Sequence, residues 1–141
     1  MRCVLYVFVM ALILAACSRP PDEVRIRDAI AAMQDAAEAK SAAGVLDNIA
    51  GDFTGQNGEV DHDGLARILK IEFLRKDGIG VALGPISVEV DGDRATVKFE
   101  MTLRDSTERL LPGGSETYAV VSGWRRDGSR WICYNASWTR Q

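Results

Sequence analysis

The sequence predicts one α+β domain in which three helices pack on a curved antiparallel sheet. Its 141 residues are 47% hydrophobic and 26% charged, which is the profile of one ordinary globular domain. Up to residue 77 the apolar residues recur with a helical period, and after Gly78 they alternate with the period of a strand. Helices followed by a meander of strands form an α+β domain with the helices on one side of the sheet.

The first part of the helical half is predicted as two helices. An Ala-rich amphipathic run, which Asp22 can cap, predicts a helix over residues 23–42. Gly44 interrupts the run. A short second helix, with apolar residues as far as Phe53, is expected to follow and to end within residues 51–55.

A Gly- and Asp-rich connection over residues 54–61, with room for a short strand, leads to a third helix. Asp61 or Asp63 can cap this helix, and the Asp-Gly pair at residues 77–78 ends it. The predicted buried face of the third helix consists of Leu65, Ile68, Leu69 and Phe73.

The first hairpin of the sheet is predicted from a turn at residues 92–93. A two-residue turn there pairs Val90 with Ala95 and Val88 with Val97, so the apolar rows of both strands face the core. The opposite row faces solvent, which excludes its acids as general bases. That row contains Glu89, Lys98 and Glu100.

The second hairpin is predicted around residues 127–128, with strands that are apolar on both rows. A two-residue turn places Tyr118 opposite Ser137 and Val120 opposite Asn135, whereas a longer turn shifts this register. The side chains expected to face one common interior, and to line a ligand site there, are Tyr118, Trp124, Trp131 and Asn135.

The first residues are interpreted as a targeting segment outside the fold. Arg2 precedes an uncharged apolar run over residues 4–14, which is too short to cross a bilayer as a helix. The run ends in Leu-Ala-Ala-Cys at residues 14–17, which resembles the lipobox of bacterial lipoproteins. The resemblance implies a signal peptide over residues 1–16 and a diacylglycerol with further acyl chains, such as palmitate, on Cys17.

This resemblance also implies an address in the cell envelope. The acyl chains on Cys17 would anchor the protein to a membrane, with residues 17–21 as a lipidated tether. Ser18 follows the cysteine, and the lipoprotein rule then favours the periplasmic face of the outer membrane in a Gram-negative organism. An ordinary secretory cleavage site is the alternative interpretation.

The remaining chain, residues 22–141, resembles the nuclear transport factor 2-like superfamily, a cone-shaped group that includes ketosteroid isomerase. The resemblance lies in the order of the elements, the Asp-Gly hairpin before Trp131, and the closing strand Tyr-Asn-Ala-Ser-Trp at residues 134–138. It implies a pocket between the concave face of the sheet and the helices. A cystatin-like helix-on-sheet domain of different connectivity is the alternative fold.

Several kinds of chemistry are not expected. Seventeen basic and twenty acidic residues leave a net charge of −3, without the basic field that nucleic-acid binding needs. His62 is the only histidine and is expected at a helix cap, so neither a metal site nor a cofactor is predicted. Cys133 has no neighbouring base in the sequence and is expected to be a buried residue rather than a nucleophile.

Three function classes follow. The preferred hypothesis is a membrane-anchored envelope lipoprotein with a non-catalytic role, as an accessory protein or as a binder of a small apolar ligand. The first alternative is an isomerase- or hydratase-like enzyme in the cone pocket, with Tyr118 as the donor and Glu116 or Asp52 as the base. The second alternative is a homodimeric interaction module that uses an open face of the sheet.

Overall fold

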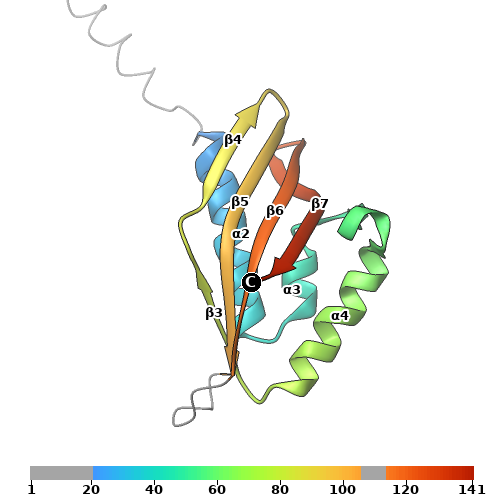
Figure 1. Cartoon of the computed structure of the whole chain (residues 1–141). Helices are drawn as coiled ribbons and strands as arrows, with labels where there is room; N and C mark the ends of the chain where they lie inside the picture. The colour runs from blue at the N-terminus through green and yellow to red at the C-terminus, as the bar shows by residue number, and fades with distance from the viewer. Residues whose placement is uncertain (1–20, 106–113) are drawn as a thin grey trace, which may run out of the picture.

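The computed structural model describes residues 21–105 and 114–141, which form a curved sheet with the helices against its inner face (Figure 1). The helices are α2 (Asp22–Glu38), α3 (Ala42–Leu46), the short 3₁₀ helix η2 (Gln56–Gly58) and α4 (His62–Arg75). The strands are β1 (Ile49–Gly55), β2 (Val60–Asp61), β3 (Ile79–Leu83), β4 (Ser87–Asp91), β5 (Arg94–Asp105), β6 (Ser115–Asp127) and β7 (Arg130–Arg140). The strand order is β2-β1-β7-β6-β5-β3, and β4 also pairs with β5.

The sheet is mixed, because β1 runs parallel to β7 while the other pairs are antiparallel. The prediction that a second helix continues to residues 51–55 is therefore wrong beyond Leu46. Ile49 and Phe53 are four residues apart, which fits a helix, yet both are buried in a strand that joins β7 through a hydrogen bond from Cys133 N to Asn48 O (2.9 Å). A partner so distant in the sequence leaves no local signal.

The single helix predicted over residues 23–42 is divided in two. Helix α2 ends at Glu38, and the chain reverses at Lys40, whose φ of 57° is left-handed. Ser41 then caps α3, because its side chain accepts a hydrogen bond from Gly44 N at 3.1 Å. The Ala-rich composition predicts helix throughout this segment, but it does not reveal the reversal.

Strand β3 was not predicted. It pairs with the second half of β5 from Ile79↔Asp105 to Leu83↔Met101, while β4 pairs with the first half. The long strand β5 thus has two partners along one edge. Within the first hairpin the predicted pairs Val88↔Val97 and Val90↔Ala95 are confirmed.

The second hairpin has a different register from the predicted one. Its turn lies one residue later, with Asp127 paired to Arg130, and the register shifts again between Gly123 and Trp124. Tyr118 therefore lies opposite Arg140 instead of Ser137. At this irregularity a Cβ on Gly123 would lie 2.5 Å from Asn135 Oδ1, so the close approach requires glycine.

Two groups of buried side chains hold the helices to the sheet. The larger contains Ile26 and Ile30 of α2 with Val97, Trp124 and Trp131 of the sheet. The smaller consists of Val45, Phe73, Ile79 and Val81. Both groups contribute residues to one cavity, which therefore lies between them.

Helix α4 is capped by Asp61, whose Oδ1 accepts a hydrogen bond from Gly64 N at 2.7 Å. Of its predicted buried face only Phe73 is buried; Leu65 and Leu69 are half-buried, and Ile68 is 39% exposed. The period was predicted correctly, but the apolar face of α4 borders a hollow instead of a packed core.

Candidate functional site

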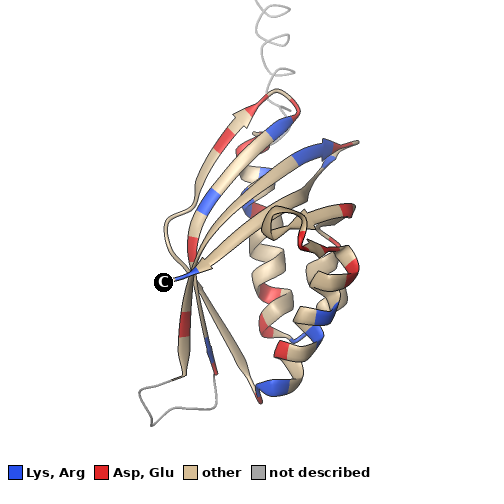
Figure 2. Cartoon of the chain, turned by 45° about the vertical axis from the view of Figure 1, so that its right-hand side comes forward, with Lys and Arg blue, Asp and Glu red and all other residues tan. Residues whose placement is uncertain are grey.

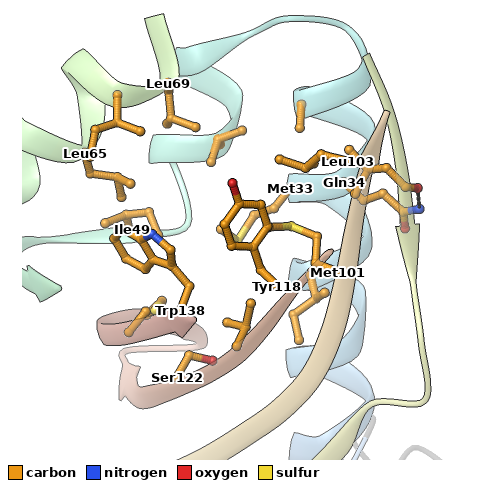
Figure 3. Close-up of a pocket in the computed structure, with 18 of the residues that line it drawn as sticks. Met33, Gln34, Ile49, Leu65, Leu69, Met101, Leu103, Tyr118, Ser122 and Trp138 are labelled. Atoms are coloured by element: carbon orange, nitrogen blue, oxygen red, sulfur yellow. Dashed lines mark hydrogen bonds between the residues drawn. The ribbon is translucent and has the colours of Figure 1, made fainter. Parts of the chain in front are cut away.

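A cavity of about 330 Å³ lies between the three α-helices and the inner face of the sheet. Its lining is almost entirely apolar. Figure 3 shows Tyr118 and Trp138 projecting from the strands toward Leu65 and Leu69 of α4, with Met33 of α2 on the other side. In β6 and β7 the charged residues stand only near the two ends of each strand (Figure 2), so the middle of these two strands has no charged side chain.

Two polar side chains that line this cavity, Ser122 and Gln34, are hydrogen-bonded within the protein. Ser122 Oγ accepts a hydrogen bond from Trp124 Nε1 at 3.0 Å, and Gln34 Nε2 donates to Val81 O at 2.8 Å. Cys133 is 3% exposed, and burial raises the pKa of its thiol to about 12. Among the described residues that line the deep part of the cavity, there is therefore no base and no reactive thiolate.

The mouth of the cavity is polar. Tyr118 Oη donates to Glu116 Oε2 at 2.9 Å, and Glu116 Oε1 lies 3.2 Å from Arg140 Nη2. On the α4 side, Glu72 pairs with Arg75 at 3.3 Å, and Lys76 follows directly. Glu72, Lys76 and Tyr118 border both the apolar hollow and this polar rim.

The hydrogen bond between Glu116 and Tyr118 changes the pKa values of both side chains. The hydrogen bond from Tyr118 lowers the pKa of the Glu116 carboxyl, with the charge of Arg140 in support and partial burial in opposition. Burial raises the pKa of Tyr118, and the hydrogen bond to Glu116 raises it further. Glu116 is thus a stabilised carboxylate and Tyr118 a neutral hydroxyl, which is the opposite of the raised carboxyl pKa expected of a general base.

Asp52 lies away from the cavity. It is exposed on β1, not at the end of a helix as predicted, and binds Arg125 through both oxygens at 2.7 and 2.9 Å. The hydrogen bond from Arg125 lowers the pKa of Asp52. The structure therefore provides no access from Asp52 to a ligand in this cavity.

The structure separates the four predicted ligand-binding residues into two pairs. Tyr118 and Trp124 line the cavity. Trp131 is buried in the core, with its Nε1 donating to Asp22 Oδ1 at 3.1 Å. Asn135 is exposed, and its Oδ1 accepts from Gly123 N at 2.9 Å. The expectation that Asn135 shares an interior with Tyr118 is wrong because of the shifted register of the second hairpin.

Sequence reasoning missed several residues of the mouth. Arg140 reaches Glu116 only in the observed register, in which it pairs with Tyr118. Lys76 precedes the unpredicted strand β3, so nothing assigned it to a cavity. The local signal that was present is the Tyr118-Glu116 spacing of two, which places both side chains on one face of a strand.

His62 begins α4, with its Nδ1 3.8 Å from Asp63 Oδ1. Over residues 21–105 and 114–141, no three His, Cys, Asp or Glu side chains are grouped to hold a metal ion. Within the same ranges, no helix has the length and apolar character needed to cross a membrane. The predicted lipidation site Cys17 lies outside the described residues.

No protein-family profile matches this sequence, and no curated protein is significantly similar to it. Solved structures do resemble the fold. A nuclear transport factor 2-like protein with a cystatin-like fold from Novosphingobium aromaticivorans superposes with a TM-score of 0.68 at 20% identity, covering 93% of this chain and 86% of its own. A candidate scytalone dehydratase from the same organism gives 0.73 at 10% identity, with 85% and 84% covered.

Bd1075 of Bdellovibrio bacteriovorus gives a TM-score of 0.70 at 10% identity. The match covers 82% of the present chain but only 40% of Bd1075, so the shared domain is less than half of that protein. At these identities the likeness concerns the backbone alone. The chain has the nuclear transport factor 2-like, cystatin-like fold, with a curved mixed sheet.

Proposed function

We propose that this protein is a lipid-anchored envelope protein whose domain binds a small, largely apolar ligand without transforming it. One observation carries the proposal: the fold keeps an apolar hollow of about 330 Å³ where a domain of this size could have packed a continuous core. That volume is at the lower end of the range of ligand pockets, which starts near 300 Å³.

The non-catalytic part rests on the protonation and pairing of the polar groups. Ser122 and Gln34 are satisfied inside the protein, and the Glu116 carboxylate is held by Tyr118 and Arg140. A ligand in the hollow therefore meets apolar walls and few groups able to exchange a proton.

Binding is tested by filling the cavity. Val120 lines it, whereas the next residue, Val121, is 43% exposed on the outer face of the same strand. The neutral fluorophore N-phenyl-1-naphthylamine should bind the purified protein saturably. Val120→Trp should raise its Kd about tenfold or more, because the indole occupies the space, and Val121→Trp should leave the Kd unchanged. Non-saturable binding, or equal Kd values for the two variants, would contradict the proposal.

The anchoring part rests on the sequence of residues 14–18. The Leu-Ala-Ala-Cys run joined to an apolar run supports acylation of Cys17, and Ser18 supports residence at the periplasmic face of an outer membrane. Metabolic labelling with a fatty-acid analogue should mark the wild type but not Cys17→Ala. Label retained by the variant would show that the anchor is elsewhere.

A second candidate function is an isomerase- or hydratase-like activity. The observation that favours it is the 2.9 Å contact between Tyr118 Oη and Glu116 Oε2 at the cavity mouth. The lowered pKa of Glu116 weighs against it. NMR titration can follow the carboxyl pKa of Glu116 with and without a bound ligand, and the Glu116→Gln variant, which lacks this signal, assigns it. A pKa of Glu116 that rises on ligand binding would favour the enzyme over the binding protein.

A further inference from the structure

Lys76 stands where the apolar cavity meets its polar rim, directly after α4. It lines both regions and is half-buried. The main chain at this point is hydrogen-bonded to the segment between α2 and α3, because Lys40 Nζ donates to the carbonyl oxygens of Lys76 at 2.6 Å and of Asp77 at 3.3 Å. These two hydrogen bonds fix the main-chain position of Lys76 at the entrance of the cavity.

The other charges of the rim are already engaged. Glu72 pairs with Arg75, and Glu116 pairs with Arg140 while accepting the hydrogen bond of Tyr118. Asp105, which also borders the rim, has an interaction of its own. Of the ion pairs in residues 21–105 and 114–141, none includes Lys76.

The position of Lys76 at the rim of an apolar cavity indicates a class of ligand, and this inference rests on the binding function proposed above. We propose that the cavity takes an alkyl monocarboxylate, with the carboxylate at the Lys76 ammonium and the chain between α4 and the sheet. Lys76 acts on Glu116 through its charge but forms no ion pair within the described residues, and such a half-buried cation is best complemented by a single negative charge. Tyr118 cannot serve as the donor to the same headgroup while its hydroxyl proton is shared with Glu116.

The walls suit the rest of such a molecule. The lining includes Leu69, Met33 and Phe99 beside Lys76 and Tyr118, and among the described lining residues the only other polar side-chain group without a hydrogen-bond partner is the indole N–H of Trp138. An unbranched alkyl chain can follow this apolar surface. A cationic headgroup would meet Lys76 as a like charge, and an uncharged one would leave the ammonium without a counter-ion.

The test compares three probes with the same ten-carbon chain: decanoate, decan-1-ol and decyltrimethylammonium. Isothermal titration calorimetry on the purified full chain should give the lowest Kd for decanoate. Lys76→Met keeps the length of the side chain and removes its charge. It should raise the Kd of decanoate about tenfold, as expected for a charge-assisted hydrogen bond, and leave that of decan-1-ol unchanged. Lys70→Met, at an exposed position of α4 outside the cavity lining, is the matched control and should change neither.

The outcomes separate the two proposals. If decan-1-ol and decanoate bind equally, or if Lys76→Met leaves decanoate binding unchanged, the monocarboxylate assignment is overturned and the binding function stands. If Lys76→Met weakens both ligands equally, Lys76 acts through packing and the assignment is likewise overturned. If neither of these two ligands binds the wild type and N-phenyl-1-naphthylamine does not bind either, the binding function itself fails.

Discussion

The two ends of α2 lie in very different surroundings. At its beginning, Asp22 binds Arg126 at 2.6 Å and Trp131 at 3.1 Å, and the guanidinium of Arg126 lies 5.3 Å from the Trp131 ring centroid. The next turns bury Ile26 and Ile30 completely or nearly so. At its end, the helix borders the cavity, with half-buried Met33 and Ala37. The same sheet thus has a filled end and a hollow end.

The difference follows from the helices that cover each end. Over the filled end α2 lies directly on the sheet, and Ile26 is buried in one cluster with Val97 and Trp131, none of which lines the cavity. At the hollow end α4 stands beside α3, away from the central strands (Figure 1), and residues of α4 and of the sheet line the cavity. Phe73 is the one buried side chain of α4. The packing is therefore continuous between the beginning of α2 and the sheet, and it is interrupted by the cavity between α4 and the sheet.

The two ends are also far apart. Helix α2 has 17 residues, so about 25 Å separates Asp22 from the region where Lys40 contacts Lys76. The proposed lipid tether enters at the filled end, immediately before Asp22.

The largest expected effect is a difference in stability between the ends. Trp131→Ala should lower the free energy of unfolding by about 3 to 5 kcal/mol, because it removes a 3% exposed indole from packed surroundings. Met101→Ala, at the cavity wall, should cost only about 1 kcal/mol, since its neighbours already border empty space. Urea titrations of both variants measure the difference. Equal losses would mean that the cavity is filled in solution.

Substitution of Asp22 should have an intermediate effect on the free energy of unfolding. Asp22→Ala removes the ion pair with Arg126 and leaves Trp131 Nε1 without its acceptor, which should cost about 1 kcal/mol. Asp22→Asn keeps an oxygen for the indole and should lose less. Thermal unfolding of the two variants compares the contributions. If both lose the same amount, the ion pair is the dominant contact and the indole bond adds nothing.

The fold could be predicted from the sequence wherever the deciding interactions are local. The period change at Gly78, the cap at Asp61 and the first hairpin all depend on residues that are close in the chain, and the structure contains each of them. Strand β1 was mistaken for a helix because its partner β7 lies about eighty residues away. The register between two strands that are distant in the sequence is equally hard to predict, because no local pattern determines it.

The prediction of the candidate site from the sequence was limited by the register of the second hairpin. Alternation predicted that Tyr118 faces an interior, since period two is local. Which residues share that interior depended on a turn displaced by one residue and on a bulge at Gly123. The bulge depends on the approach of Asn135 to Gly123, a contact that alternation cannot reveal. Tyr118 and Trp124 therefore line the cavity, whereas Trp131 and Asn135 do not.

The smallest expected effect concerns Glu116 at the hollow end. Its pKa is lowered in the folded protein, so it contributes stability above the unfolded pKa, and this contribution is lost as the pH falls through the folded value. Glu116→Gln removes the contribution. Its free energy of unfolding should be lower than that of the wild type at pH 7, by about 0.5 kcal/mol at this partly exposed pair, and the difference should shrink as the pH is lowered toward 3. Urea titrations at the two pH values measure it, with Glu100→Gln on the exposed face of β5 as the control that should follow the wild type. A difference of the same size at both pH values would mean that Glu116 acts through packing and not through its charge.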